Sequence, residues 1–326
     1  MKKLLISMGD PGGVGPEIIA QALSSSVVRK SCIPIVVGDT RIMGKALHLL
    51  RNSRKLQEIP SPDEAEGSGR RIYIINVETM IPQAIPQKIP TAAGGGASVS
   101  YIRKAVELAM HKQVDGIVTA PVSKEALKMA GFAWPGHTEM LAELSRTRSY
   151  AMMLVAGPLR VILVTIHTAL KNVPELITRQ RILQIIRLAK KACDMLKIRN
   201  PRIAVAGLNP HAGEAGIFGD EEITKIVPAI RQANREGIPA SGPYPPDIVF
   251  YKACQGEIDI VVSMYHDQGL IPLKTTAFDK GVNVTVGLPF VRTSPDHGTA
   301  YDIAWKGMAN PSSMIEAIKL AAKLKI

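Results

Sequence analysis

Three histidines each follow an apolar run that is typical of a buried strand. The run VILVTI precedes His167, IAVAGLNP precedes His211 and IDIVVSMY precedes His266. Ligands of open α/β sheets bind beyond the carboxyl ends of the strands, so these imidazoles are expected to converge. Three histidine ligands with an open fourth position are typical of a catalytic divalent-metal site, with zinc the first choice and magnesium, manganese or cobalt the alternatives. Asp267 would fix an imidazole tautomer or cap a turn, and any single histidine here could instead be an ordinary loop residue bonded to backbone.

A second set of residues suits an anionic substrate. The sequence PGHTE places His137 and Thr138 at a helix start, whose free N–H groups favour phosphate or carboxylate, although Thr138 could equally be a plain N-cap. Lys274, Asn283 and Arg292 lie in and around the strand-like VNVTV. Lysine offers a point charge and arginine a planar fork, a pairing that suits phosphate and carboxylate together. Solvated surface charge is the alternative for each cation.

Two glycine- or proline-containing turns have no assigned chemistry. Residues 9–17, GDPGGVGPE, follow a strand and open a helix, but they fit neither of the phosphate-binding patterns GxGxxG and GxxxxGK[ST]. Residues 119–124, TAPVSK, form a similar turn that ends in Lys124. Spacing alone therefore predicts two tight strand-to-helix connections and leaves their roles open.

The elements that must position these residues alternate between short apolar runs and helical patterns, which predicts an α/β fold with mostly parallel sheets covered by helices. The polar residues 51–70 read as a loop, and residues 81–96, with three prolines and Gly94–Gly96, read as a break. The predicted strands are Leu4–Met8, Ile33–Val37, Ile72–Val77, Gly116–Thr119, Met152–Val155, Val161–Ile166, Ile203–Ala206, Ile258–Ser263 and Val282–Val286.

Length and composition limit the classes of protein. A chain of 326 residues predicts about two domains, and three scattered cysteines with no apolar run of membrane length favour a cytoplasmic protein. The net charge of +12 suits nucleic acid, an anionic membrane surface or small anions. Aromatic residues make up only 4% of the chain, and the basic residues are spread along helices, which does not favour nucleic-acid binding. The prediction is therefore an enzyme without nucleic-acid or membrane partners, and a non-catalytic nucleic-acid-binding protein is the remote alternative.

Several blocks in one order resemble the 4-hydroxythreonine-4-phosphate dehydrogenase family. They are GDPGGVGPEII, TAPVSKEAL, PGHTE, GLNPHAGE, MYHDQGLIPLK and GVNVTVGLPFVRTSPDHGTA, and they span essentially the whole chain. The resemblance implies an NAD-dependent oxidoreductase that oxidises the C3 hydroxyl of a phosphorylated four-carbon acid. The resulting β-keto acid then loses CO₂, which in pyridoxine (vitamin B6) biosynthesis converts 4-hydroxythreonine 4-phosphate to 3-amino-2-oxopropyl phosphate.

The same resemblance implies roles for particular residues. It implies a homodimer with the metal site at the subunit interface, where the third histidine comes from the partner subunit. The implied metal ligands are His167, His211 and His266, and the implied substrate contacts are His137, Thr138, Lys274, Asn283 and Arg292.

The C-terminal stretch HGTAYDIA is similar to the adenosine-binding loop of isopropylmalate and isocitrate dehydrogenases. This likeness implies a two-lobed fold with an active-site cleft between a cofactor-side lobe, residues 1–130 plus 270–326, and a metal and dimerisation lobe, residues 131–269. Asp302 would bind the adenosine ribose and repel a 2′-phosphate, which favours NAD over NADP. The implied cofactor-binding residues are Gly298, Thr299, Ala300, Asp302 and Asn310.

Two questions stay open in the sequence. The candidate general base is Asp247, with metal-bound water or an active-site histidine as alternatives. The sequence His167-Thr168-Ala169-Leu170 stands where the vitamin B6 enzymes tend to have His-Leu-Pro-Leu, and Pro135 and the run at residues 245–247 also look more like a sibling branch. That branch oxidises 4-phospho-D-threonate or 4-phospho-D-erythronate to dihydroxyacetone phosphate.

Overall fold

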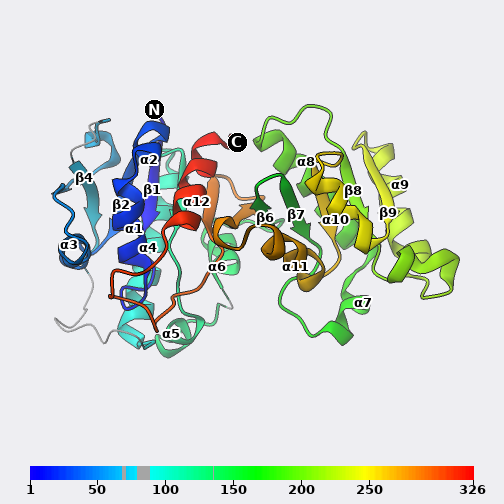
Figure 1. The fold of residues 1–326 in the computed structure, drawn as a ribbon, viewed down its shortest axis with the longest axis horizontal. Coiled ribbons are helices and arrows are strands. Elements are labelled where there is room, and N and C mark those ends of the chain that lie inside the picture. Colours follow the sequence, from blue (N-terminus) through cyan, green and yellow to red (C-terminus); the bar gives the residue numbers. More distant parts are fainter. Residues whose placement is uncertain (68–70, 79–88, 135) are drawn as a thin grey trace. The chain divides into compact units, whose positions relative to one another are not determined.

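The chain forms two compact units, shown in Figure 1. The computed structural model describes residues 1–67, 71–78, 89–134 and 136–326; Pro135 and parts of the predicted loop and break lie outside these ranges. Unit 1 comprises residues 1–148, 288–324 and 326, and unit 2 comprises residues 149–287 and 325. Each unit boundary lies further along the chain than the predicted lobe boundary. The reason is that helix α6 (His137–Leu144) contacts helix α4 (Ala92–Met110) in unit 1, whereas strand β11 (Val282–Val286) pairs with β6 (Ala151–Ala156) in unit 2.

Unit 1 is built on a parallel sheet with the strand order β3-β4-β2-β1-β5-β12. Its strands are β1 (Lys3–Ser7), β2 (Ile33–Gly38), β3 (Lys55–Glu58), β4 (Arg71–Asn76), β5 (Gly116–Thr119) and β12 (Val291–Pro295). Leu4, Leu5 and Ile6 of the central strand are fully buried, as a strand covered on both faces requires. The other helices of the unit are α1 (Gly15–Ser24), α2 (Ser26–Ser31), α3 (Thr40–Leu49), α5 (Lys124–Met129) and α12 (Ser312–Lys323).

The two ends of the chain meet inside unit 1. The C-terminal helix α12, red in Figure 1, contacts the neighbouring strand β12. It also contacts α1, α2 and β1, which belong to the start of the chain and are blue. The loop between β12 and α12 therefore belongs to the same unit as the glycine-rich turn that precedes α1.

Unit 2 contains a mixed sheet with the order β11-β6-β7-β10-β8-β9. The pairs β11–β6 and β6–β7 are antiparallel, and the pairs β7–β10, β10–β8 and β8–β9 are parallel. Its other strands are β7 (Leu159–Leu163), β8 (Ile203–Ala206), β9 (Ala240–Tyr244) and β10 (Ile260–Ser263). Its helices are α7 (Val173–Leu176), α8 (Arg179–Met195), α9 (Val227–Arg235), α10 (Pro246–Cys254) and α11 (His266–Ala277).

The predicted α/β class with mostly parallel sheets and flanking helices is confirmed. The predictions of some individual strands and of one helix start were wrong. Strands β3, β9 and β12 were not predicted, and β3 lies in the polar segment that was read as a loop. Gly94–Gly96 belong to α4 rather than to a break, because Thr91 caps that helix by accepting a hydrogen bond from the Gly94 N–H at 3.0 Å. Among the described residues, no helix combines the length and the apolar character needed to span a membrane.

Replacing either of two adjacent glycines of α4 by alanine is expected to change the free energy of unfolding in opposite directions. A Cβ added at Gly95 would collide with the backbone of Ala126 in α5, whereas a Cβ at Gly96 would meet no atom within 4 Å. We expect Gly95→Ala to lower the free energy of unfolding by about 1–3 kcal/mol through overpacking. The matched variant Gly96→Ala should raise it by up to about 1 kcal/mol, because alanine is the better helix former. Thermal and urea unfolding of both variants would measure this, and equal stabilities would contradict the close α4–α5 contact.

Candidate functional site

Unit 2 brings two of the predicted metal ligands together. His167 follows β7 and His266 begins α11, and their ring centroids are 5.6 Å apart. Both line a surface pocket with Ile166, Tyr265 and Asp267. The Nδ1 atom of His266 lies 2.7 Å from Oδ1 of Asp267. Because an ionised carboxylate only accepts hydrogen bonds, Nδ1 carries the proton and Nε2 keeps a lone pair that could bind a metal ion.

The remaining predicted ligand, His211, follows strand β8 rather than β7 or β10. It begins a turn in which five consecutive residues, His211 to Ala215, have positive φ angles between 41° and 80°. Its ring lies 6.3 Å from that of Phe218, and it does not line the pocket of His167 and His266. Within the described part of the chain, no three His, Cys, Asp or Glu side chains form a group able to hold a metal ion. One chain therefore supplies a pair of imidazoles rather than a complete set of three.

Two buried polar side chains support the strand ends that carry these histidines, and the sequence analysis did not identify either. Gln268 accepts hydrogen bonds from Ser263 Oγ and Met264 N at the end of β10, and donates one to Gly207 O beyond β8. Glu222 accepts hydrogen bonds from the backbone N–H groups of Leu208 and Asn209 at 2.7 and 2.8 Å. A polar residue on an otherwise apolar helix face is the only sequence signal for either role.

Unit 1 contains a buried cation beside a histidine. Arg292, on β12, is 1% exposed and donates a hydrogen bond from Nη2 to Thr119 Oγ1 at 2.6 Å; burial lowers its pKa to about 9. Burial, and then the positive charge of Arg292, hold the pKa of His137 well below its usual value, so this imidazole is neutral at pH 7. The buried Nε2 of His137 has no hydrogen-bond partner among the described residues. The Arg292 guanidinium suits an anionic oxygen, whereas Nε2 of a neutral His137 that donates its other ring N–H to the Ala120 backbone is placed to accept a hydrogen bond, as from a hydroxyl.

The first residues of α6 do not include a side-chain N-cap. The N-cap residue is Gly136, and no side chain caps the helix. Thr138 lies inside the first turn and is 4% exposed, so the plain N-cap role considered for it is wrong. The free N–H groups of this first turn stay available to an anion.

The remaining predicted substrate residues lie in unit 2. Lys274 is on α11 with its Nζ 5.3 Å from the ring centroid of Phe278. Asn283 is on β11, and its buried Oδ1 has no hydrogen-bond partner among the described residues. Asp247 is exposed in the first turn of α10 and does not line the pocket of the two histidines.

The predicted cofactor-binding residues lie in the loop between β12 and α12. Gly298 and Asp302 are exposed, and Ala300 has a positive φ of 42°. Asn310 accepts a hydrogen bond from the Ser312 N–H at 2.9 Å, at the start of α12. The exposed Asp302 carboxylate fits a ligand with hydroxyl groups, such as a ribose.

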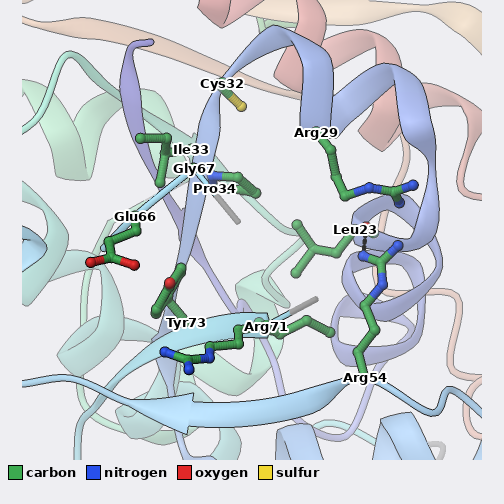
Figure 2. A pocket seen from close by; sticks show the side chains of 11 residues that line it. Leu23, Arg29, Cys32, Ile33, Pro34, Arg54, Glu66, Gly67, Arg71 and Tyr73 are labelled. Carbon is green, nitrogen blue, oxygen red and sulfur yellow. Dashed lines mark hydrogen bonds between the residues drawn. The ribbon is translucent and has the colours of Figure 1, made fainter. Parts of the chain in front are cut away.

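Two arginines that line a small pocket near the start of β2 have a structural role. Figure 2 shows Arg29 and Arg54 beside Leu23, with Ile33 and Pro34 of β2 nearby. Both arginines donate hydrogen bonds to the carbonyl of Ser24, and Arg54 also donates to that of Leu23, so they stabilise the C-terminal end of α1. None of the predicted site residues lines this pocket.

Known proteins resemble this chain over its full length. A 4-hydroxythreonine-4-phosphate dehydrogenase of Trichlorobacter lovleyi is 47% identical over 99% of this chain and 97% of its own. A D-threonate 4-phosphate dehydrogenase of Pectobacterium atrosepticum is 45% identical over 99% of both chains. Among solved structures, a 4-hydroxythreonine-4-phosphate dehydrogenase from Klebsiella pneumoniae is 43% identical, covers 98% of each chain and superposes with a TM-score of 0.91.

A family assignment follows from these likenesses. The sequence pattern of the pyridoxal phosphate biosynthetic protein PdxA matches residues 30–321. The resemblance found in the sequence blocks is thereby confirmed, and with it the assignment to a dehydrogenase class of enzyme. The chain belongs to the PdxA family.

Proposed function

We propose that this protein is an NAD- and divalent-metal-dependent dehydrogenase that oxidises the C3 hydroxyl of a 4-phosphorylated four-carbon acid and releases CO₂. The observation that carries the proposal is the buried Arg292 guanidinium beside the neutral His137 imidazole. Burial of a guanidinium costs desolvation free energy, and an anionic substrate bound beside it would offset part of that cost. A phosphorylated acid has two anionic groups that suit such a site.

The ligands of the proposed metal site come from two subunits. His167 and His266 of one chain offer two imidazole nitrogens, and His211 of the partner subunit would complete the set of three. When bound, the metal would polarise the substrate's C3 oxygen, and the nicotinamide of NAD would accept the hydride. This arrangement makes a homodimer the active form.

The chain's own residues then have distinct tasks. Arg292 binds an anionic group of the substrate through its planar fork, while His137 forms a hydrogen bond without adding charge. Asn283 offers its unused Oδ1 to a substrate hydroxyl or amino group. Asp267 holds the His266 ring by accepting from Nδ1, and Asp247 is the proposed proton acceptor.

There are two candidate substrates for the proposed reaction. The first is 4-hydroxythreonine 4-phosphate, which would give 3-amino-2-oxopropyl phosphate and place the protein in pyridoxine biosynthesis. The second is 4-phospho-D-threonate or its erythronate isomer, which would give dihydroxyacetone phosphate. The first is the principal candidate, and a 47% identical relative is named for it. The second is supported by the sequence Thr168-Ala169-Leu170 after His167, which resembles the aldonate branch, and by a 45% identical relative named for D-threonate 4-phosphate.

A coupled assay of NADH formation distinguishes the two. We expect one of the two phosphorylated acids to be oxidised with a kcat/KM at least about 100-fold above the other, because a site built to bond an amino or hydroxyl group discriminates strongly. A chelator should abolish the activity, and added divalent metal should restore it. No turnover of either acid with metal and NAD present would refute the proposal.

A further inference from the structure

The glycine-rich turn of residues 9–17 has a specific neighbour in unit 1. Its residues contact the loop of residues 299–307, which contains most of the predicted cofactor-binding residues. Val14 N–H donates to Thr299 O at 2.9 Å, and a Cβ at Gly13 would lie 2.8 Å from that same oxygen. Glycine at this position therefore permits the two backbones to approach.

The strongest connection between the turn and the loop is the carboxylate of Glu17. This side chain is fully buried in the first turn of α1, and each of its oxygens accepts one backbone N–H of the loop. Oε2 accepts from Trp305 and Oε1 from Gly307, both at 2.6 Å. Both donor residues have positive φ angles, 58° and 71°. A left-handed tryptophan is strained, so the loop needs bonds of this kind to keep its shape.

Two further bonds fasten the same loop. Tyr301 donates its hydroxyl to Asp10 Oδ2 at 2.7 Å, and Trp305 donates Nε1–H to Pro11 O at 3.0 Å. Between these fixed points Asp302 is exposed. The loop is therefore held along its inner side and presents one carboxylate to solvent.

We propose that Glu17 is a positioning residue for the dinucleotide: its paired hydrogen bonds hold residues 299–307 in the conformation that presents Asp302 to the adenosine ribose. This inference rests on the proposed function, since it takes this loop to be the NAD-binding loop. It gives the glycine-rich turn a role in cofactor binding by way of the loop, without any contact between the turn and a phosphate.

The variant Glu17→Gln tests the inference with little change in shape. Glutamine keeps one acceptor oxygen but directs an NH₂ group at the other backbone N–H, so one bond is lost and two donors face each other. We expect the dissociation constant for NADH and the KM for NAD to rise roughly tenfold, with less than about a twofold change in the KM for the phosphorylated acid. The amide of Trp305 or Gly307 should also exchange hydrogen at least about tenfold faster in the absence of any cofactor.

The controls separate this role from a merely structural one. Glu107→Gln makes the same chemical change on the exposed face of α4 and should alter none of these values. If Glu17→Gln does not fold, Trp305→Phe, which removes only the bond to Pro11 O from the loop's polar contacts, should weaken NADH binding in the same direction. Unchanged NADH binding and amide exchange would overturn the inference, as would equal losses of affinity for both substrates. Failure of the unaltered protein to bind NADH would instead refute the proposed function on which it rests.

Discussion

A heterodimer of His211→Ala and His266→Ala subunits is expected to recover about half of the activity of the unaltered dimer, although each variant alone is inactive. Each single change removes a proposed metal ligand and should lower kcat by a factor of more than about 1000. The structure pairs His266 with His167 and leaves His211 in a separate turn of the same chain. If each site takes His167 and His266 from one chain and His211 from its partner, the heterodimer contains one intact site and one doubly altered site.

Two affinity tags on the co-expressed subunits would isolate this heterodimer for assay and for metal analysis. The matched control is the heterodimer of His167→Ala and His266→Ala, which should stay inactive because both ligands come from the same chain and neither site is intact. His111→Ala, which changes the exposed C-cap residue of α4, should leave metal content and activity unchanged. No recovery in the His211 and His266 heterodimer would show that the three ligands do not divide between chains in this way.

The elements of the fold were predictable where burial alone determines the residue types. Strands β5, β8 and β11 have the predicted bounds, because each is rich in Val, Ile or Thr, which favour strands. Strand β12 was missed because its sequence, VRTSP, contains a charged and two hydroxyl residues that are nonetheless buried. Strands β3 and β9 lie at the edges of their sheets, where backbone hydrogen bonds suffice and polar side chains are tolerated.

The candidate site was predictable in its residue types and less so in its arrangement. Histidines at strand ends and the family blocks predicted the candidate residues, but only the structure separates the pair His167 and His266 from His211. The supporting residues Glu17, Gln268 and Glu222 were not identified from the sequence, where a polar residue on an apolar helix face is only a weak signal. In a sequence, a buried carboxylate or amide that bonds backbone N–H groups far along the chain looks the same as a surface one, because its partners are fixed by the tertiary fold.

Replacing the buried Arg292 is expected to separate function from stability. Arg292→Met keeps most of the side-chain volume and removes the desolvation cost of a guanidinium that is 1% exposed. That gain offsets the loss of its hydrogen bond to Thr119, so the melting temperature of the empty protein should change little. The same change should lower kcat/KM for the phosphorylated acid by about 100- to 1000-fold, or about 3–4 kcal/mol, because the substrate anion then lacks its buried partner. The KM for NAD should change little, since Arg292 lies on β12 and not in the loop of residues 299–307.

Ligand-induced stabilisation gives this last prediction a readout that does not depend on turnover. Inorganic phosphate or the phosphorylated acid should raise the melting temperature of the unaltered protein, because a ligand that binds only the folded state stabilises it by mass action. That rise should disappear in Arg292→Met and be partly kept in Arg292→Lys, which retains the charge but loses the planar fork. Arg187→Met, at an exposed ion pair with Glu236, is the matched control and should keep the full rise. A variant Arg292→Met that unfolds at much lower temperature yet binds the phosphorylated acid normally would show that the buried guanidinium serves the fold and not the substrate.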